Sequence, residues 1–169
     1  GARRPPAQRV SRTLILLRHG KSGYPLGVAD HDRPLAPRGE RQATLAGQWM
    51  RDEGLDVDAA LCSTALRTRE TLARTGVSAP AQFIGDLYGA WSSEILETIR
   101  VHAPESAHTL LVVGHVPGMP ATAADLDPDA GVPEFPTSAY AVLTVGVPWA
   151  ELGLAVNPGC HLVGVRIPR

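Results

Sequence analysis

The strongest constraint on the fold comes from two short apolar runs that each lead into a histidine. The first run, residues 13–17, leads into Arg18-His19, and the second, residues 109–113, leads into Gly114-His115. Runs of this length, rich in branched aliphatic side chains, are typical of parallel strands buried on both faces. In open α/β sheets, the carboxyl ends of such strands border the ligand crevice. We therefore expect the two histidines to share one polar site.

Further strands and helices are expected to alternate along the chain. Helical spacing and stop signals predict four helices. The first runs from Pro37 to near Gly54, and the second begins after Ser63, which is expected to cap it. The third covers residues 92–102, and the fourth runs from Pro117 to about residue 125. More strands are predicted at residues 58–62, 82–84, 139–145 and 162–167, the last two as antiparallel additions near the sheet edge. This order predicts an α/β three-layer sandwich with a mostly parallel central sheet and helices on both faces.

Length and composition are typical of one ordinary globular domain. The chain has 169 residues, of which 44% are hydrophobic and 20% are charged, and this length suffices to bury a core without metals or disulfides. We expect residues 1–12 to form a flexible tail and residues 13–169 to form a single domain. Because no apolar run approaches the length of a membrane span or of a signal-peptide core, we expect a cytoplasmic protein with no membrane partner.

Charge and cysteine content narrow the possible partners and cofactors. A formal net charge of -1 lacks the basic character of a nucleic-acid binder, so a phosphate site would have to be a local cluster of positive charge. The two cysteines, Cys62 and Cys160, have neither disulfide-framework nor metal-ligand spacing. We expect Cys62 to be a small buried hydrophobe, with a single bridge to Cys160 as the alternative. No metal or other cofactor is expected.

Four side chains near predicted strand ends could together handle a phosphoryl group. His19 is the candidate nucleophile, since neutral imidazole can attack phosphorus and nearby guanidinium groups disfavour its protonated form. Arg18 and Arg67 are candidates to hold the phosphoryl oxygens in their planar forks. Arg67 also lies near a predicted helix N-terminus, which favours anions. His115 is expected to stabilise charge on the same oxygens.

The other arginines and histidines are expected to have no part in this site. Arg69 and Arg74 are interpreted as solvated helix residues. The histidines without a strand-end setting are expected to be satisfied by backbone groups in loops: His31, His102, His108 and His161.

Several of these segments together resemble the histidine phosphatase superfamily, also called phosphoglycerate-mutase-like, and within it the small bacterial phosphohistidine phosphatases. The matching segments follow the order of the family over most of the chain, at residues 16–22 (LLRHGKS), 33–39 (RPLAPRG), 63–71 (STALRTRET), 113–119 (VGHVPGM) and 137–139 (TSA). The resemblance implies that His19 is phosphorylated during turnover. It also implies that Arg18, Arg67 and His115 complete the phosphate pocket.

Two further residues, Ser22 and Gly20, are assigned to substrate binding. The resemblance implies that the Ser22 hydroxyl approaches the phosphate, with loop capping as its alternative role. Two other positions depart from the family pattern. Position 116 is Val where relatives often carry Asn, which alters the rim of the pocket. Position 36 is Ala where a Thr cap is common, which costs a helix cap.

The general acid is the least defined part of the expected mechanism. Many superfamily members use a carboxylate to protonate an alkoxide leaving group. The nearest candidates here are Asp86 and Glu94, and a surface or capping role is the alternative for each. An imidazole is a better leaving group than an alkoxide and depends less on a proton donor. The weak acid signal therefore favours phosphohistidine as the substrate.

These observations lead to one main functional hypothesis and two alternatives. The main hypothesis is a metal-independent phosphatase that hydrolyses phosphohistidine in a protein through a phosphohistidine intermediate on His19. The first alternative is a small-molecule phosphomonoesterase of the same superfamily. The second is a non-catalytic module that binds phosphorylated partners. The expected partner is thus a phosphorylated protein or a small phosphate ester.

Overall fold

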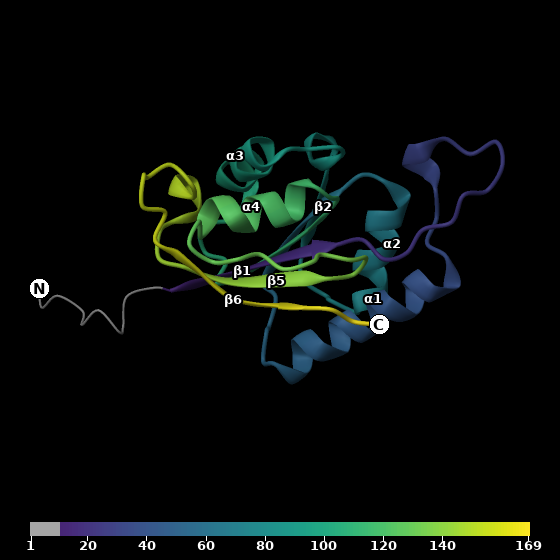
Figure 1. Cartoon of the computed structure of the whole chain (residues 1–169), viewed down its shortest axis with the longest axis horizontal. Helices are drawn as coiled ribbons and strands as arrows, with labels where there is room; N and C mark the ends of the chain where they lie inside the picture. Colours follow the sequence, from purple (N-terminus) through teal and green to yellow (C-terminus); the bar gives the residue numbers. More distant parts are fainter. Residues whose placement is uncertain (1–10) are drawn as a thin grey trace, which may run out of the picture.

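The computed structural model describes residues 11–169, whose six strands form one sheet (Figure 1). The strands are β1 (Arg12–Arg18), β2 (Ala59–Ser63), β3 (Ala81–Ile84), β4 (Thr109–Gly114), β5 (Tyr140–Val145) and β6 (Cys160–Arg166). They lie in the order β3-β2-β4-β1-β5-β6. The first four in this order pair in parallel, whereas β5 is antiparallel to β1 and β6 to β5. The predicted mostly parallel sheet with two late antiparallel strands at its edge is confirmed.

Helices cover both faces of this sheet, as the α/β sandwich prediction requires. Helices α1 (Pro37–Asp52) and α2 (Leu66–Thr75) pack on one face, and α3 (Ser92–His102) and α4 (Gly118–Leu126) on the other (Figure 1). Three short 3-10 helices lie in the connections, at Asp30–Asp32 (η2), Gly85–Leu87 (η3) and Trp149–Glu151 (η4).

The core lies on both sides of β1, and this explains the continuous apolar run that ends near His19. Leu14 and Leu16 belong to the cluster under α3 and α4, whereas Ile15 and Leu17 belong to the cluster under α1 and α2. All four side chains are fully buried. Burying each one stabilises the fold by about 1.5–3 kcal/mol relative to exposure, so β1 is firmly held where it leads into the site.

Two glycines of α1 permit close backbone approaches. A Cβ atom at Gly47 would lie 2.0 Å from the carbonyl oxygen of Thr75, at the end of α2. A Cβ atom at Gly39 would lie 2.0 Å from the carbonyl oxygen of Lys21. Neither position has room for a side chain. Helix α1 therefore packs tightly against both α2 and the segment that follows His19.

The start of α2 differs from the prediction. Its N-cap is Ala65, which makes no side-chain cap, and Ser63 is the last residue of β2. The Ser63 hydroxyl lies 2.8 Å from Nε2 of His115 and 3.3 Å from the backbone nitrogen of Ala65. The predicted helix cap at Ser63 was therefore wrong, because this side chain reaches towards a neighbouring strand end instead.

Two other expectations concern the tail and the cysteines. Strand β1 begins at Arg12, and the rest of the predicted tail lies largely in residues 1–10, outside the described residues. The division into a tail and a single domain stays a prediction. Both cysteines are free and buried. Because Cys62 and Cys160 belong to the core clusters on opposite faces of the sheet, the alternative of a bridge between them is excluded in this structure.

Candidate active site

Strand register brings the two predicted histidines together. Arg18 at the end of β1 is paired with Gly114 at the end of β4, and the His19 amide donates to the Gly114 carbonyl at 3.1 Å. The next residue of each strand is therefore a histidine at the same sheet edge. The ring centroids of His19 and His115 lie 5.3 Å apart, and each residue is only 8% exposed.

The His19 ring is held in one tautomer by its own loop. Its Nδ1 lies 2.7 Å from the carbonyl oxygen of Gly20, so in the neutral ring Nδ1 carries the proton and donates it there. The Gly20 amide in turn donates to Thr71 Oγ1 at 2.9 Å, and the Ser138 amide donates to the His19 carbonyl at 2.9 Å. This arrangement leaves Nε2 as the ring atom with a free lone pair.

Both histidines are held in the neutral form. Burial lowers the pKa of His19 to about 3, and the neighbouring charges of His115, Arg67 and Arg18 act in the same direction, against the Gly20 hydrogen bond. Burial, followed by the charge of Arg67, lowers the pKa of His115 to about 4. At neutral pH the Nε2 atom of His19 is therefore unprotonated and nucleophilic.

Two arginines bring positive charge to the histidines, and each has an unsatisfied donor. Arg67 donates through Nη1 to the Asp30 carbonyl at 2.7 Å and through Nη2 to the Asp30 carboxylate at 3.1 Å. Arg18 donates through Nη1 to the Phe135 carbonyl at 3.0 Å. The Nε atoms of both guanidinium groups are buried and have no partner among the described residues. Because buried donors are normally paired, such N–H groups fit an anion with several acceptor oxygens.

A hollow of about 370 Å³ lies over this cluster. It is lined by His19, Asp30, Arg67, Tyr88, Gly89, His115 and Val116. The valine, in place of the Asn of many relatives, thus lies at the pocket as expected. Arg18 is not among the lining residues, but its charge acts on both histidines. The structure therefore brings together all four side chains that sequence analysis proposed for phosphate handling.

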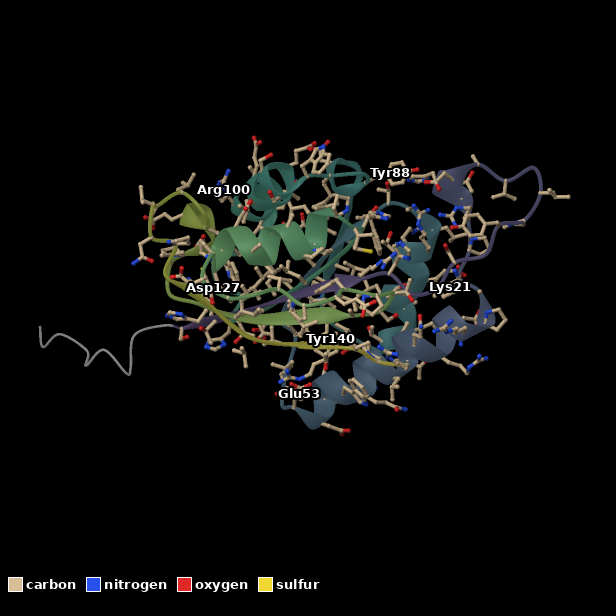
Figure 2. All side chains as sticks on the ribbon, in the orientation of Figure 1. Lys21, Glu53, Tyr88, Arg100, Asp127 and Tyr140 are labelled. Carbon is tan, nitrogen blue, oxygen red and sulfur yellow. The ribbon has the colours of Figure 1, made fainter. Side chains whose placement is uncertain are left out.

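Sequence analysis missed Asp30 and Tyr88, which line the hollow, and His31, which packs beside it. Tyr88 donates a hydrogen bond to the Asp30 carboxylate, and Figure 2 shows this tyrosine beside the loop that carries η2. His31 was expected to be an ordinary loop histidine, but its ring packs edge-on against Tyr88 at 4.9 Å and its Nε2 lies 2.8 Å from Thr64 Oγ1. The only sequence signal was the Asp-His-Asp cluster of residues 30–32, which carries no periodicity.

The Asp30 carboxylate is kept ionised by its neighbours. The hydrogen bond from Tyr88 has the largest effect, and hydrogen bonds from Arg33 and Arg67 act with it to lower the pKa of Asp30 far below its usual range. Asp30 is consequently an anion at the pocket entrance over the physiological pH range. It can accept hydrogen bonds there but cannot donate a proton.

The remaining predicted site residues lie elsewhere or have other contacts. Asp86, the candidate proton donor, lies in η3 and lines a separate hollow with Glu94 and Glu97 rather than the one over His19. The Ser22 hydroxyl accepts a hydrogen bond from Arg33 Nη1 at 2.6 Å, and Ser22 does not line the hollow. Gly20 uses both of its backbone groups to orient His19.

Residues 11–169 contain neither a metal-binding cluster nor a membrane-spanning helix. No group of three or more histidine, cysteine, aspartate and glutamate side chains could hold a metal ion within this range. No helix within it is long and apolar enough to cross a membrane.

Comparison with known proteins agrees with this fold. The sequence model of the histidine phosphatase superfamily (branch 1) matches residues 14–87. An uncharacterized protein of Mycobacterium tuberculosis is 51% identical over 163 residues, covering 90% of this chain and 100% of the relative. The chain belongs to the histidine phosphatase superfamily and is thus a hydrolase of the phosphatase class.

Within the superfamily, the chain is of the small bacterial SixA type. A structure from Nakamurella multipartitia, assigned as a phosphohistidine phosphatase SixA, has a TM-score of 0.85 and 42% identity, covering 94% of this chain and 96% of the other. The phosphohistidine phosphatase SixA of Escherichia coli is 25% identical over 137 residues, 78% of this chain and 84% of the relative. The fold is shared with a protein histidine phosphatase SixA complexed with tungstate (TM-score 0.78, 24% identity, covering 92% and 97%).

Proposed function

We propose that the protein removes the phosphoryl group from phosphohistidine in a protein substrate, through a phosphohistidine intermediate on His19. The observation that carries the proposal is the state of the His19 ring. Its Nδ1 proton is committed to Gly20, and its Nε2 lone pair lies in a buried, cationic pocket. The four proposed catalytic residues are His19, Arg18, Arg67 and His115.

The proposed reaction proceeds in two displacements at phosphorus. In the first, Nε2 of His19 forms a bond to phosphorus while the bond to the substrate imidazole breaks, and the released nitrogen takes a proton from solvent. In the second, water attacks the phosphorus of phospho-His19, releases inorganic phosphate and restores the neutral ring. Arg18, Arg67 and His115 stabilise the charge on the phosphoryl oxygens during both steps.

The distribution of carboxylates supports phosphohistidine over a phosphate monoester. An alkoxide leaving group needs a proton donor, whereas imidazole depends on one much less. Asp30 is held ionised and Asp86 lines a different hollow, so neither is suited to protonate an alkoxide at this pocket. The names of the SixA relatives from Escherichia coli and Nakamurella multipartitia support the same substrate class. Two free cysteines further support the proposal of a cytoplasmic location.

Trapping the intermediate tests the proposal. The protein is mixed with a histidine-phosphorylated protein at low temperature, digested under alkaline conditions and analysed by mass spectrometry. We expect an acid-labile phosphoryl group on the peptide containing His19, and no label or hydrolysis in His19→Ala. The His102→Ala variant, altered at the far end of α3, serves as the matched control and should behave as wild type.

Two outcomes would contradict the proposal. A label on another residue, or wild-type turnover by His19→Ala, would remove His19 from the mechanism. Faster turnover of sugar phosphates than of the phosphorylated protein would instead support the small-molecule phosphomonoesterase.

Incubation with EDTA should leave turnover unchanged if the reaction is metal-independent as proposed.

A further inference from the structure

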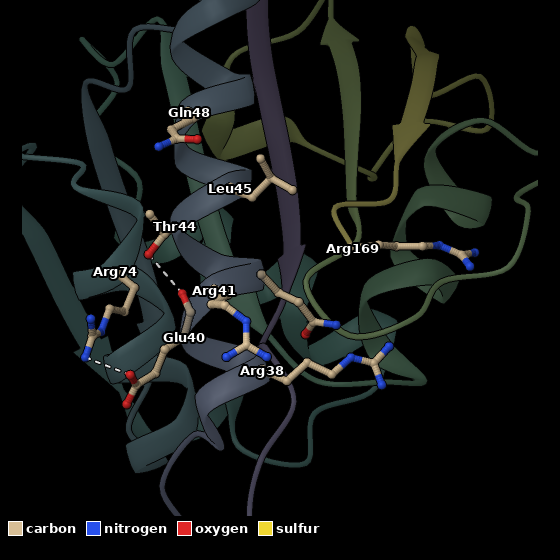
Figure 3. Close-up of a pocket in the computed structure, with 9 residues that line it drawn as sticks. Arg38, Glu40, Arg41, Thr44, Leu45, Gln48, Arg74 and Arg169 are labelled. Atoms are coloured by element: carbon tan, nitrogen blue, oxygen red, sulfur yellow. Dashed lines mark hydrogen bonds and ion pairs between the residues drawn. The ribbon is translucent and has the colours of Figure 1, made fainter.

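A second hollow, separate from the one over His19, is rich in arginine. It has a volume of about 550 Å³, and Arg38, Arg41, Arg74 and Arg169 are among the residues that line it. Arg38, Arg41, Leu45 and Gln48 are spaced three, four and three residues apart, so they form one stripe along α1. Figure 3 shows this stripe beside Arg169 at the end of the chain. We call Arg38, Arg41 and Arg169 the arginine cluster.

The positive charge of this hollow is largely uncompensated. Glu40 is its one acidic lining residue, and it forms an ion pair with Arg74 at 3.0 Å. The three residues of the arginine cluster have no ion pair or side-chain hydrogen bond within residues 11–169, and Figure 3 draws no contact to them. Residues 1–10 contain no aspartate or glutamate that could neutralise the cluster. In a chain with a net charge of -1, this is a marked local excess of positive charge.

The hollow adjoins the segments that hold His19. Gln42 lines the hollow, and its side-chain oxygen accepts hydrogen bonds from the Lys21 amide and the Thr137 hydroxyl, each at 3.0 Å. Lys21 lies two residues after His19, and the residue after Thr137 donates its amide to the His19 carbonyl. Figure 2 shows Lys21 near the start of α1. A protein substrate that covers the catalytic pocket and continues past Lys21 would reach the arginine cluster.

We infer that the arginine cluster is a docking surface for an acidic segment of the phosphorylated protein substrate. The inference rests on the proposed function, because it names a feature of the substrate beyond its phosphohistidine. Guanidinium groups pair well with carboxylates, and several unpaired ones in a hollow form a positive surface that attracts an acidic partner. Nucleic acid fits less well, since the cluster is confined to one hollow in a chain of nearly balanced charge.

Hydrolysis of two phosphopeptides of equal length tests the inference. Both carry one phosphohistidine, flanked in one peptide by glutamates and in the other by serines. Each exposed charge pair changes affinity by up to about fivefold, so the triple variant Arg38→Gln/Arg41→Gln/Arg169→Gln should raise the KM for the acidic peptide by roughly tenfold. Turnover of the serine peptide and of free phosphohistidine should not change. Arg69→Gln, which removes an exposed arginine from α2 outside the hollow, is the matched control.

A binding measurement separates this inference from the proposed function. An unphosphorylated, fluorescently labelled glutamate-rich peptide is titrated with the protein at low and high salt. We expect salt-sensitive binding to wild type and to Arg69→Gln that is lost in the triple variant, even if no substrate is hydrolysed. Equal affinity in the triple variant, or no preference for the acidic phosphopeptide, would overturn the docking surface. Equal binding of an oligonucleotide of matched charge would overturn the assignment to an acidic protein segment.

Discussion

At the scale of single residues, the catalytic chemistry depends on which groups are already paired. The Nδ1–H group of the neutral His19 ring donates its hydrogen bond to the Gly20 carbonyl oxygen, and His115 contacts the Ser63 hydroxyl through Nε2. Arg67 is buried and is partly neutralised by Asp30, yet its Nε has no partner within residues 11–169. A phosphoryl group entering the pocket would therefore compete with the Asp30 carboxylate for the same guanidinium. Asp30 thus lowers the free energy cost of burying the Arg67 charge. Because the Asp30 side chain is itself exposed, an entering phosphoryl group can displace it from Arg67.

The contribution of Arg67 can be measured with vanadate, which resembles the phosphoryl group in its transition state. Arg67→Ala removes a charge-assisted contact and should weaken vanadate binding by about 1.5–3 kcal/mol. Inhibition titrations, or direct calorimetry if the variant is inactive, give this value. Arg69→Ala, two residues further along α2, should bind vanadate as wild type does. An unchanged affinity in Arg67→Ala would place this arginine outside the site.

At the scale of elements, helix α1 links the catalytic loop to the rest of the fold. Its first turn lies against Lys21, and its middle lies against the end of α2. Both contacts are backbone to backbone, with glycine at each. Helix α2 carries Arg67 on its first turn and Thr71 one turn later. The Thr71 hydroxyl accepts a hydrogen bond from the Gly20 amide. The two helices together therefore fix the positions of Arg67 and His19 relative to each other.

Two glycine substitutions distinguish the catalytic contact of α1 from its purely structural one. Gly47→Ala should destabilise the fold by about 1–3 kcal/mol through overpacking against Thr75, while folded molecules retain their kcat. Gly39→Ala should destabilise the fold similarly and also lower kcat, because it displaces the segment after His19. Urea unfolding and kinetics below the unfolding transition test both variants. Gly131→Ala, with open space around its Cβ, is the control; a normal kcat in folded Gly39→Ala would contradict the argument.

At the scale of the whole molecule, the buried histidines link stability to pH. The pKa of His19 is about 3 and that of His115 about 4, against an ordinary value of 6.5. At pH values between the lowered pKa of each histidine and its ordinary value of 6.5, the unfolded chain binds more protons than the folded one. The free energy of unfolding therefore falls as the pH falls below 6.5. Asp30, with its lowered pKa, contributes in the same direction only below its ordinary value of 3.8. Between about pH 4 and pH 6.5, the two histidines therefore contribute more to the loss of stability than Asp30 does.

Urea unfolding at about pH 7 and about pH 5 tests this linkage. Each of the two histidines should contribute a loss of up to about 2 kcal/mol over this interval. His19→Gln, which keeps a polar side chain that does not titrate, should show a smaller loss than wild type. Gly131→Ala, which changes no titratable group, should show the wild-type loss. Equal pH dependence in wild type and His19→Gln would show that the buried neutral state of His19 is not linked to folding.

The sequence by itself determined the fold class and the pairing of the two histidines. Parallel strands buried on both faces leave a plain apolar signature, and their carboxyl ends share one sheet edge. The run before His19 and the run before His115 therefore became neighbours as predicted, with Arg18 and Arg67 beside them. Helix boundaries also followed local signals such as Pro37 and Gly54.

Only the tertiary structure decided which further groups reach the pocket. Asp30, in η2, and Tyr88, just after η3, line the pocket although they are 58 residues apart, and His31 packs against Tyr88. No periodicity specifies where the side chains of such short segments point. Ser63 has the signature of a helix cap, yet its hydroxyl contacts His115 across the sheet edge. Asp86 was favoured by its place in the sequence, yet it lines a hollow separate from the one over His19. Local patterns fix elements, whereas long-range packing fixes the contacts between loops.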